Sequence, residues 1–241
     1  MPRVHQTWQV LPHSPLQEID DGILTVAGNI PMPLGNFPRR MTVVRLASGK
    51  TAIFSAIALP EPEMAQIEAM GEPAVLIVPN GAHRLDAKAW KQRYGLLRVL
   101  TPAGARDDVA QVVPVDATTD ILDDPDVRFV SVAGTEDRDS ALIIRRATGH
   151  TIVCNDIIGH VRHPHGIGAK VMSRMMGFGV SEPSVPRPAR LFHIKSPKAL
   201  AQQLREWAAL GDLQRIIVSH GDPITDDPAG TLRRIAGGLE H

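Results

Sequence analysis

The chain has 241 residues, of which 43% are hydrophobic, and it carries 26 basic and 26 acidic side chains. A formal net charge of zero gives no global field that would favour nucleic acid or an anionic membrane. No apolar run approaches the ~20 residues of a membrane span, and the single cysteine, Cys154, excludes an internal disulfide and a CxxC zinc site. These features predict a soluble, cytoplasmic protein of one domain, residues 1–241, with 1–21 as an N-terminal extension.

The first part of the chain is predicted to build strands before helices. Ser48-Gly49 lies between two β-branched runs, which is typical of a hairpin turn. Pro62 near the start of an amphipathic segment and Gly71 after it indicate the two ends of a helix. The expected elements are a strand at 22–27, the only one in the Pro- and Gly-rich first forty residues, a hairpin of 41–46 and 51–56, a helix at 61–71, a strand at 74–79, a helix at 86–93 and a strand at 96–100.

The second part of the chain returns to hairpins and then alternates helix with strand. A tract at 177–190 with three prolines and two glycines is typical of a long surface loop. This mixed order disfavours both a plain doubly wound sheet and a pure β-sandwich, and it fits two mixed sheets stacked face to face with helices outside. The expected elements are strands at 111–115, 128–133, 140–146, 151–155 and 214–219, and helices at 197–210 and 228–238.

Three of the predicted strands end at side chains that can bind metal. The apolar run 151–155 leads directly to Asp156, and the run 214–219 leads to His220. A third strand, 74–79, leads into a polar loop that contains His83. Because strand ends are where α/β proteins build their sites, these residues are expected to meet at one rim of the sheets.

The order of elements from about 22 to 238 resembles the metallo-β-lactamase superfamily. Within it, Pro79-Asn80-Gly81-Ala82-His83, followed by Trp90 and Tyr94, is similar to an uncharacterised branch with a Pro-Asn-x-x-His motif. The resemblance implies an α/β fold with four layers, the αββα sandwich of two mixed sheets flanked by helices.

The metal-binding motifs of that superfamily are matched unevenly. Its active members carry His-x-His-x-Asp-His, and with Asn80 in the first position the later ligands fall on Ala82, Arg84 and Leu85, which are not plausible metal ligands. A further superfamily histidine is also missing before the strand 140–146. The resemblance carries over two positions, the metal-bridging aspartate onto Asp156 and the final histidine onto His220.

These residues leave open what the site contains. His83, Asp156 and His220 can supply the three protein ligands of a hydrolytic metal site, with zinc, iron or manganese as the expected metal. His160, from the His-x-x-His-x-His segment at 160–165, is a fourth candidate ligand, although a polar loop is the favoured interpretation of that segment, since Pro164 rules out a regular helix. Asp86 is the candidate general base that would orient a water. A metal-free cleft is the other expectation.

Two functions therefore remain. The first is a metal-dependent hydrolase acting on an ester, thioester, amide or phosphoester, with a reduced ligand set. The second is a non-catalytic relative that binds a small molecule or a protein partner in the same cleft without metal.

Overall fold

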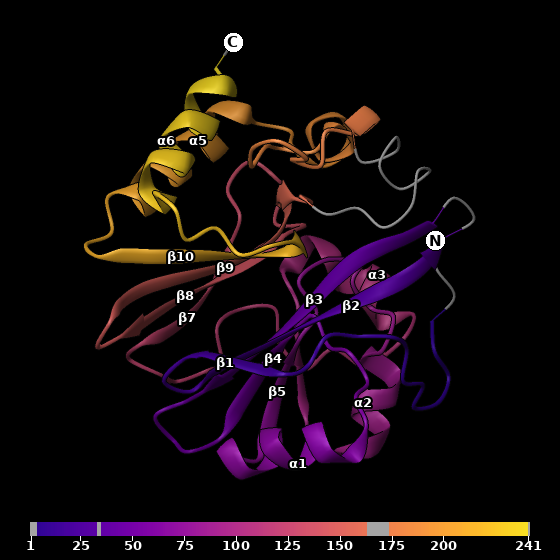
Figure 1. The fold of residues 1–241 in the computed structure, drawn as a ribbon. Coiled ribbons are helices and arrows are strands. Elements are labelled where there is room, and N and C mark those ends of the chain that lie inside the picture. Colours follow the sequence, from indigo (N-terminus) through magenta and orange to yellow (C-terminus); the bar gives the residue numbers. More distant parts are fainter. Residues whose placement is uncertain (1–3, 33–34, 163–173, 241) are drawn as a thin grey trace.

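The computed structural model of the protein describes residues 4–32, 35–162 and 174–240. Its strands form two sheets that lie face to face, with helices on the outer sides (Figure 1). The first sheet has the order β1-β2-β3-β4-β5-β6 and the second has the order β10-β9-β8-β7. The strands are β1 Gln17–Asp20, β2 Ile23–Met32, β3 Gly35–Arg45, β4 Thr51–Phe54, β5 Pro73–Ile77, β6 Arg98–Leu100, β7 Val127–Ser131, β8 Ser140–Arg146, β9 Gly149–His160 and β10 Leu213–Gly221.

The helices begin and end where local chemistry favours it. Helix α1 has a proline in its first turn together with Glu61 and Glu63, whose charges suit the positive end of a helix. Helices α5 and α6 begin at side-chain caps, from Ser196 and Asp227 respectively. No helix in the described ranges is long and apolar enough to cross a bilayer. The bounds are α1 Glu61–Met70, α2 Ala87–Arg93, α3 Arg106–Ala110, α5 Pro197–Ala208 and α6 Pro228–Gly238, with a π-helical turn at Ala189–His193.

Three buried clusters of apolar side chains lie between these layers and together form the core. The middle cluster lies between the sheets and includes Phe54 and Val153. A second fills the space between the first sheet and helices α1 and α2, around Trp90. A third lies between the second sheet and helices α5 and α6, around Leu204. The layer order is therefore helix, sheet, sheet, helix, which confirms the predicted αββα sandwich.

A long hairpin extends the first sheet beyond its other strands. Strands β2 and β3 pair from Ile23–Val44 out to Met32–Gly35, whereas β4 pairs only with Thr42–Arg45. Among the described residues, no strand pairs with the outer half of β3 on its other side, and Pro38 lies in this half, where an edge position tolerates a proline. The prediction of a single strand in the first forty residues was wrong, because β2 continues to Met32 and β3 already begins at Gly35. In addition, β1 forms inside the expected N-terminal extension and pairs with β2.

The strand predicted at 111–115 was also wrong. Helix α3 occupies the preceding residues, with Asp107 and Asp108 in its first turn, and the chain then turns rather than extending. Val109 and Val113 are both buried in the cluster around Trp90. Val109 thus packs from the helix and Val113 from the turn after it, where a strand was predicted.

Candidate metal centre

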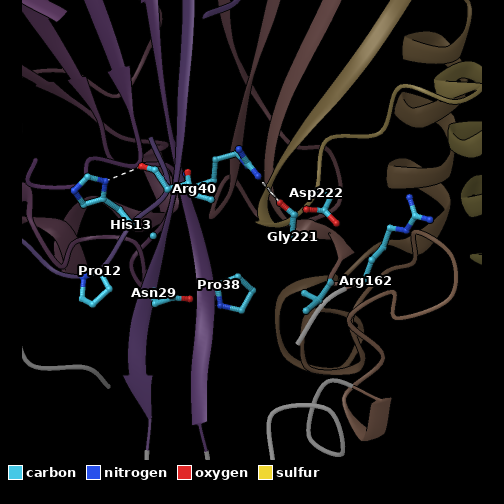
Figure 2. A pocket seen from close by; sticks show the side chains of 12 residues that line it. Pro12, His13, Asn29, Pro38, Arg40, Arg162, Gly221 and Asp222 are labelled. Carbon is cyan, nitrogen blue, oxygen red and sulfur yellow. Dashed lines mark hydrogen bonds between the residues drawn. The ribbon is translucent and has the colours of Figure 1, made fainter. Parts of the chain in front are cut away.

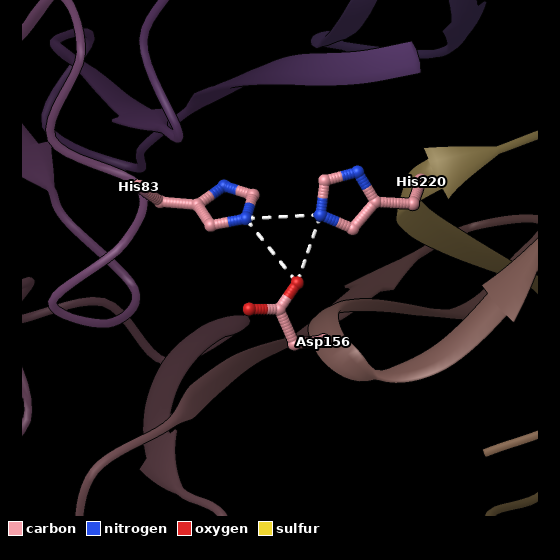
Figure 3. A group of neighbouring side chains, drawn as sticks. All are labelled: His83, Asp156 and His220. Atoms are coloured by element: carbon pink, nitrogen blue, oxygen red, sulfur yellow. Dashed lines mark hydrogen bonds and ion pairs between the residues drawn. The ribbon is translucent and has the colours of Figure 1, made fainter. Parts of the chain in front are cut away.

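His83, Asp156 and His220 meet at one rim of the sandwich, and each comes from a different segment (Figure 3). His83 lies in the loop after β5, Asp156 in β9 and His220 near the end of β10. The Nε2 atoms of the two histidines are 3.1 Å apart, and Oδ1 of Asp156 lies 2.8 Å from Nε2 of His220 and 3.3 Å from Nε2 of His83. The sequence prediction that these three residues converge is thus matched by the geometry.

An irregularity between two parallel strands places Asp156 in this group. Strands β9 and β10 pair regularly up to Cys154 and Val218, and the next pair is Gly159 with His220. Residues 155–158 of β9 therefore face a single residue of β10. Such a bulge re-aims side chains beside a site, and here it accompanies the approach of Asp156 to His220.

Each imidazole is held from behind through its other ring nitrogen. Nδ1 of His220 lies 2.7 Å from the carbonyl oxygen of Pro38, and Nδ1 of His83 lies 2.9 Å from Oγ of Ser55. Ser55 is a buried residue with a left-handed backbone (φ 56°) at the end of β4. Second contacts of this kind fix the orientation of metal-binding histidines.

The protons on the two histidines can be assigned in part. A carbonyl oxygen only accepts hydrogen bonds, so Nδ1 of His220 carries a proton and donates it to Pro38. In a neutral ring, Nε2 of His220 then presents a lone pair to the centre of the group. Two Nε2 atoms and a carboxylate oxygen that face one another at about 3 Å need a shared proton or a cation between them.

Asn80 fixes both the loop and the carboxylate. Its Oδ1 accepts hydrogen bonds from the backbone N–H groups of Ala82 (2.8 Å) and His83 (3.1 Å), an arrangement typical of asparagine in turns. Its Nδ2 donates to Oδ2 of Asp156 at 2.7 Å. Asn80 therefore both shapes the loop and contacts the carboxylate of Asp156 directly.

Electrostatics keep these groups in the ionisation states that a metal requires. Burial lowers the pKa of His83, although the Asp156 charge opposes that change. Burial alone would raise the pKa of Asp156, but the charges and hydrogen bonds of His83 and His220 outweigh burial and hold it well below its usual range. A neutral imidazole and an ionised carboxylate are the forms that bind metal.

A second, buried polar group adjoins the centre. Burial raises the pKa of Asp139 well above its ordinary value, and the nearby charge of Asp156 adds to the rise. Oδ2 of Asp139 and both polar side-chain atoms of Asn155 have no hydrogen-bond partner among the described residues. Asp139 immediately precedes β8.

Two other predicted site residues lie outside the group. The carboxylate of Asp86 is fully buried and binds Nη1 of Arg39 (2.5 Å) and Nδ1 of His5 (2.7 Å). His160 points its Nδ1 to the carbonyl oxygen of Asp222 at 3.0 Å. Neither Asp86 nor His160 belongs to the group of His83, Asp156 and His220, whose ligand atoms lie within 4.8 Å of one another. His163 and His165 lie outside the described residues.

The positions that lack ligand chemistry have other uses. The side chain of Arg84 binds the carbonyl oxygen of Asp108, and Leu85 is buried. The centre thus rests on one residue of the Pro-Asn-x-x-His loop, His83, in place of several.

Aromatic rings and an open hollow border the centre. The ring of Phe37 lies 4.6 Å from that of His220 and 4.8 Å from that of Phe178. A hollow of about 320 Å³ lies between the β2–β3 hairpin and the end of β10, where Arg40 donates to the carbonyl oxygen of Gly221 (Figure 2). Pro38, whose carbonyl holds His220, lines that hollow. His83, Asp156 and His220 do not line this hollow, and it adjoins the centre through Pro38.

The three ligand atoms fit a single divalent metal. Ligands bound about 2.0–2.1 Å from a tetrahedral zinc lie roughly 3.3 Å from one another. The observed separations of 2.8, 3.1 and 3.3 Å are close to that value. Two imidazoles and one carboxylate also suit zinc, iron or manganese.

Several residues of this site had no signal in the sequence. The β2–β3 hairpin and β4 bring three of them into place. Pro38 contacts His220, Ser55 contacts His83, and Arg39 binds Asp86. Asp139 could have been found as a polar residue directly before a buried strand, the same signal that identified Asp156 and His220.

Comparisons with known proteins identify the fold. No family model and no curated protein sequence matches the chain. Among solved structures, TMB-1 matches with a TM-score of 0.64 and 13% identity, over 96% of this chain and 100% of that one. The metallo-β-lactamase FIM-1 from Pseudomonas aeruginosa, solved in a mono-zinc form, matches with a TM-score of 0.60 and 12% identity over 97% and 98%. The metallo-β-lactamase DIM-1 matches with a TM-score of 0.62 and 11% identity over 95% and 99%.

Proposed function

We propose that this chain, which has the metallo-β-lactamase fold, is a hydrolase that uses one divalent metal held by His83, Asp156 and His220. The observation that carries the proposal is the convergence of three ligand atoms at 2.8–3.3 Å, with each histidine held from behind. Supporting it, the lowered pKa values of His83 and Asp156 favour the forms that bind metal.

When bound, the metal would polarise a carbonyl or phosphoryl group and lower the pKa of a water. The chain's own residues keep the ligands oriented: Ser55 and Pro38 fix the two rings, and Asn80 fixes the carboxylate. Phe37 and Phe178 offer an apolar wall next to His220. The substrate class remains an ester, thioester, amide or phosphoester. Because Asp86 is bound to Arg39 and His5, we assign it a positioning role instead of that of general base.

The alternative is a binding protein without catalysis. The observation that favours it is the replacement of superfamily ligands by Ala82, Arg84 and Leu85, of which Arg84 and Leu85 are committed to other contacts or to the core. Such a protein would use the hollow beside the hairpin to bind a small molecule or a protein partner.

Hydrolysis by the zinc-loaded protein tests the proposal against this alternative. We expect turnover of at least one member of a panel of activated esters, thioesters, amides and phosphoesters. Asp156→Asn should lower the rate more than about 100-fold, since it weakens a ligand and its contacts. His160→Ala is the matched control and should retain activity, because His160 lies outside the group. Full zinc occupancy without turnover of any substrate would favour the binding protein.

A further inference from the structure

Arg39 carries two buried N–H donor groups that no described residue satisfies. Its side chain is only 5% exposed, and Nη1 binds Asp86. Nε and Nη2 have no hydrogen-bond partner among the described residues. Unsatisfied buried donors of a charged group are costly, so their retention calls for a ligand or water.

A small cavity lies beside this guanidinium. Arg39, Ser55 and His83 line it together with apolar side chains, and its volume is about 30 Å³. One water needs roughly 10–15 Å³ measured in this way, so the cavity has room for about two waters or for a group with two oxygen atoms. A phosphate or sulfate, with four oxygens, is too large.

The two free donors have the geometry of a fork. In a guanidinium, Nε–H and one N–H of Nη2 point in parallel directions on the same edge, and this edge matches the two oxygens of a carboxylate. The other edge of Arg39 is engaged by Asp86, which in turn is held by His5. The buried ion pair therefore fixes the fork in one orientation.

Ser55 can add a third donor, a step that rests on the metal centre proposed above. A metal on Nε2 of His83 requires the proton of the neutral ring to be on Nδ1, which then donates to Oγ of Ser55 at 2.9 Å. The hydroxyl proton of Ser55 is then available to the cavity that this residue lines.

We propose that Arg39 and Ser55 form a binding site for a single carboxylate group, on the Nδ1 side of His83. The carboxylate is either a free small anion or part of a larger ligand whose remainder lies outside the cavity. Because Ser55 contacts both this site and His83, carboxylate and metal binding strengthen each other, as reciprocal linkage requires.

Formate is the probe that tests this site, by saturation-transfer-difference NMR at constant ionic strength with chloride as the reference anion. Formate is expected to bind the wild type saturably and to bind about tenfold more weakly to Arg39→Lys, which keeps the charge but loses the fork. Ser55→Ala should weaken binding in the zinc-loaded protein and change it less after treatment with EDTA. Arg40→Lys is the matched control, because Arg40 lies next in the same strand and its donors already bind Gly221 and Thr25.

Absence of saturable formate binding, or equal binding by Arg39→Lys and wild type, would overturn the site. If Arg39→Lys does not fold by circular dichroism, Ser55→Ala decides in the same way. Zinc content measured on the same samples separates this result from the metal centre, since either can fail alone. Competition by benzoate and hexanoate would identify the carboxylate as part of a larger ligand, whereas binding of formate and acetate alone would identify a small anion.

Discussion

At the residue scale, the centre depends on contacts behind the ligands as much as on the ligands. Asn80 joins two groups: the backbone of the His83 loop and the carboxylate of Asp156. It thereby links the first sheet to the second. Without the amide of Asn80, Oδ2 of Asp156 would lose its donor and the loop would lose its turn.

Replacing Asn80 with alanine should therefore weaken zinc binding by about 10–100-fold, the usual effect of removing a contact behind a ligand. Competition with a chromogenic zinc chelator measures this affinity directly. Asn36→Ala, an exposed asparagine of the hairpin, is the control and should bind zinc as the wild type does. Unchanged affinity in Asn80→Ala would show that the loop and carboxylate are held by other contacts.

The sequence predicted which three residues meet at the rim better than it predicted their surroundings. His83, Asp156 and His220 each follow an apolar run, so a local pattern pointed to them. Asp86 is three residues from His83, but its side chain turns to Arg39 and His5. Those partners are far away in sequence and gave no local signal. The general-base role expected for Asp86 therefore could not take them into account.

At the scale of elements, a partly buried ion pair connects the two sheets. Asp20 at the end of β1 binds Arg215 of β10 and Oγ1 of Thr148. Burial disfavours the charged form of Asp20, but these hydrogen bonds and the charge of Arg215 outweigh it, so the pKa of Asp20 is lowered. A lowered pKa in the folded state means that ionised Asp20 stabilises the fold.

Asp20→Asn should reduce the free energy of unfolding at pH 7 by about 1–3 kcal/mol, the range for hydrogen bonds to a charged group. The stabilisation is present above the unfolded-state pKa and is lost as pH falls through the lower folded-state pKa, so the difference between variant and wild type should shrink in acid. Urea unfolding at pH 7 and in acid, below the folded-state pKa of Asp20, measures this difference. Asp21→Asn, a neighbour with an exposed ion pair to Arg45, should cost less than about 1 kcal/mol. An equal loss in the two variants would contradict a special role for Asp20.

Elements were predicted where hydrophobic periodicity and end signals agreed. Helices at 197–210 and 228–238 correspond to α5 and α6, which have prolines and capping residues at their starts. The β2–β3 hairpin was predicted only over 22–27 and 41–46, because prolines normally interrupt a sheet. Pro31 and Pro38 are tolerated because this part of the hairpin extends past β4. Val113 was assigned to a strand at 111–115 because it belongs to a short apolar run, but that run is buried in a turn and is not extended.

At the scale of the whole molecule, the mixed order of strands and helices was sufficient to predict the four layers. Local patterns pointed to His83, Asp156 and His220, but the order of elements did not show that they come from both sheets: His83 follows β5 of the first sheet, whereas Asp156 and His220 lie in β9 and β10 of the second. The centre is thus a contact between the sheets. A metal bound there would stabilise the native state by mass action, by about 4 kcal/mol at a thousandfold excess over Kd.

Metal content is the measurement that tests the central claim most directly. We would quantify zinc, iron and manganese by elemental mass spectrometry in untagged protein purified without chelator, next to His220→Ala and the control His160→Ala. The account predicts close to one metal per chain in the wild type and in His160→Ala, and a clear loss in His220→Ala. Metal-free wild type that takes up none of the three metals on reconstitution would contradict it.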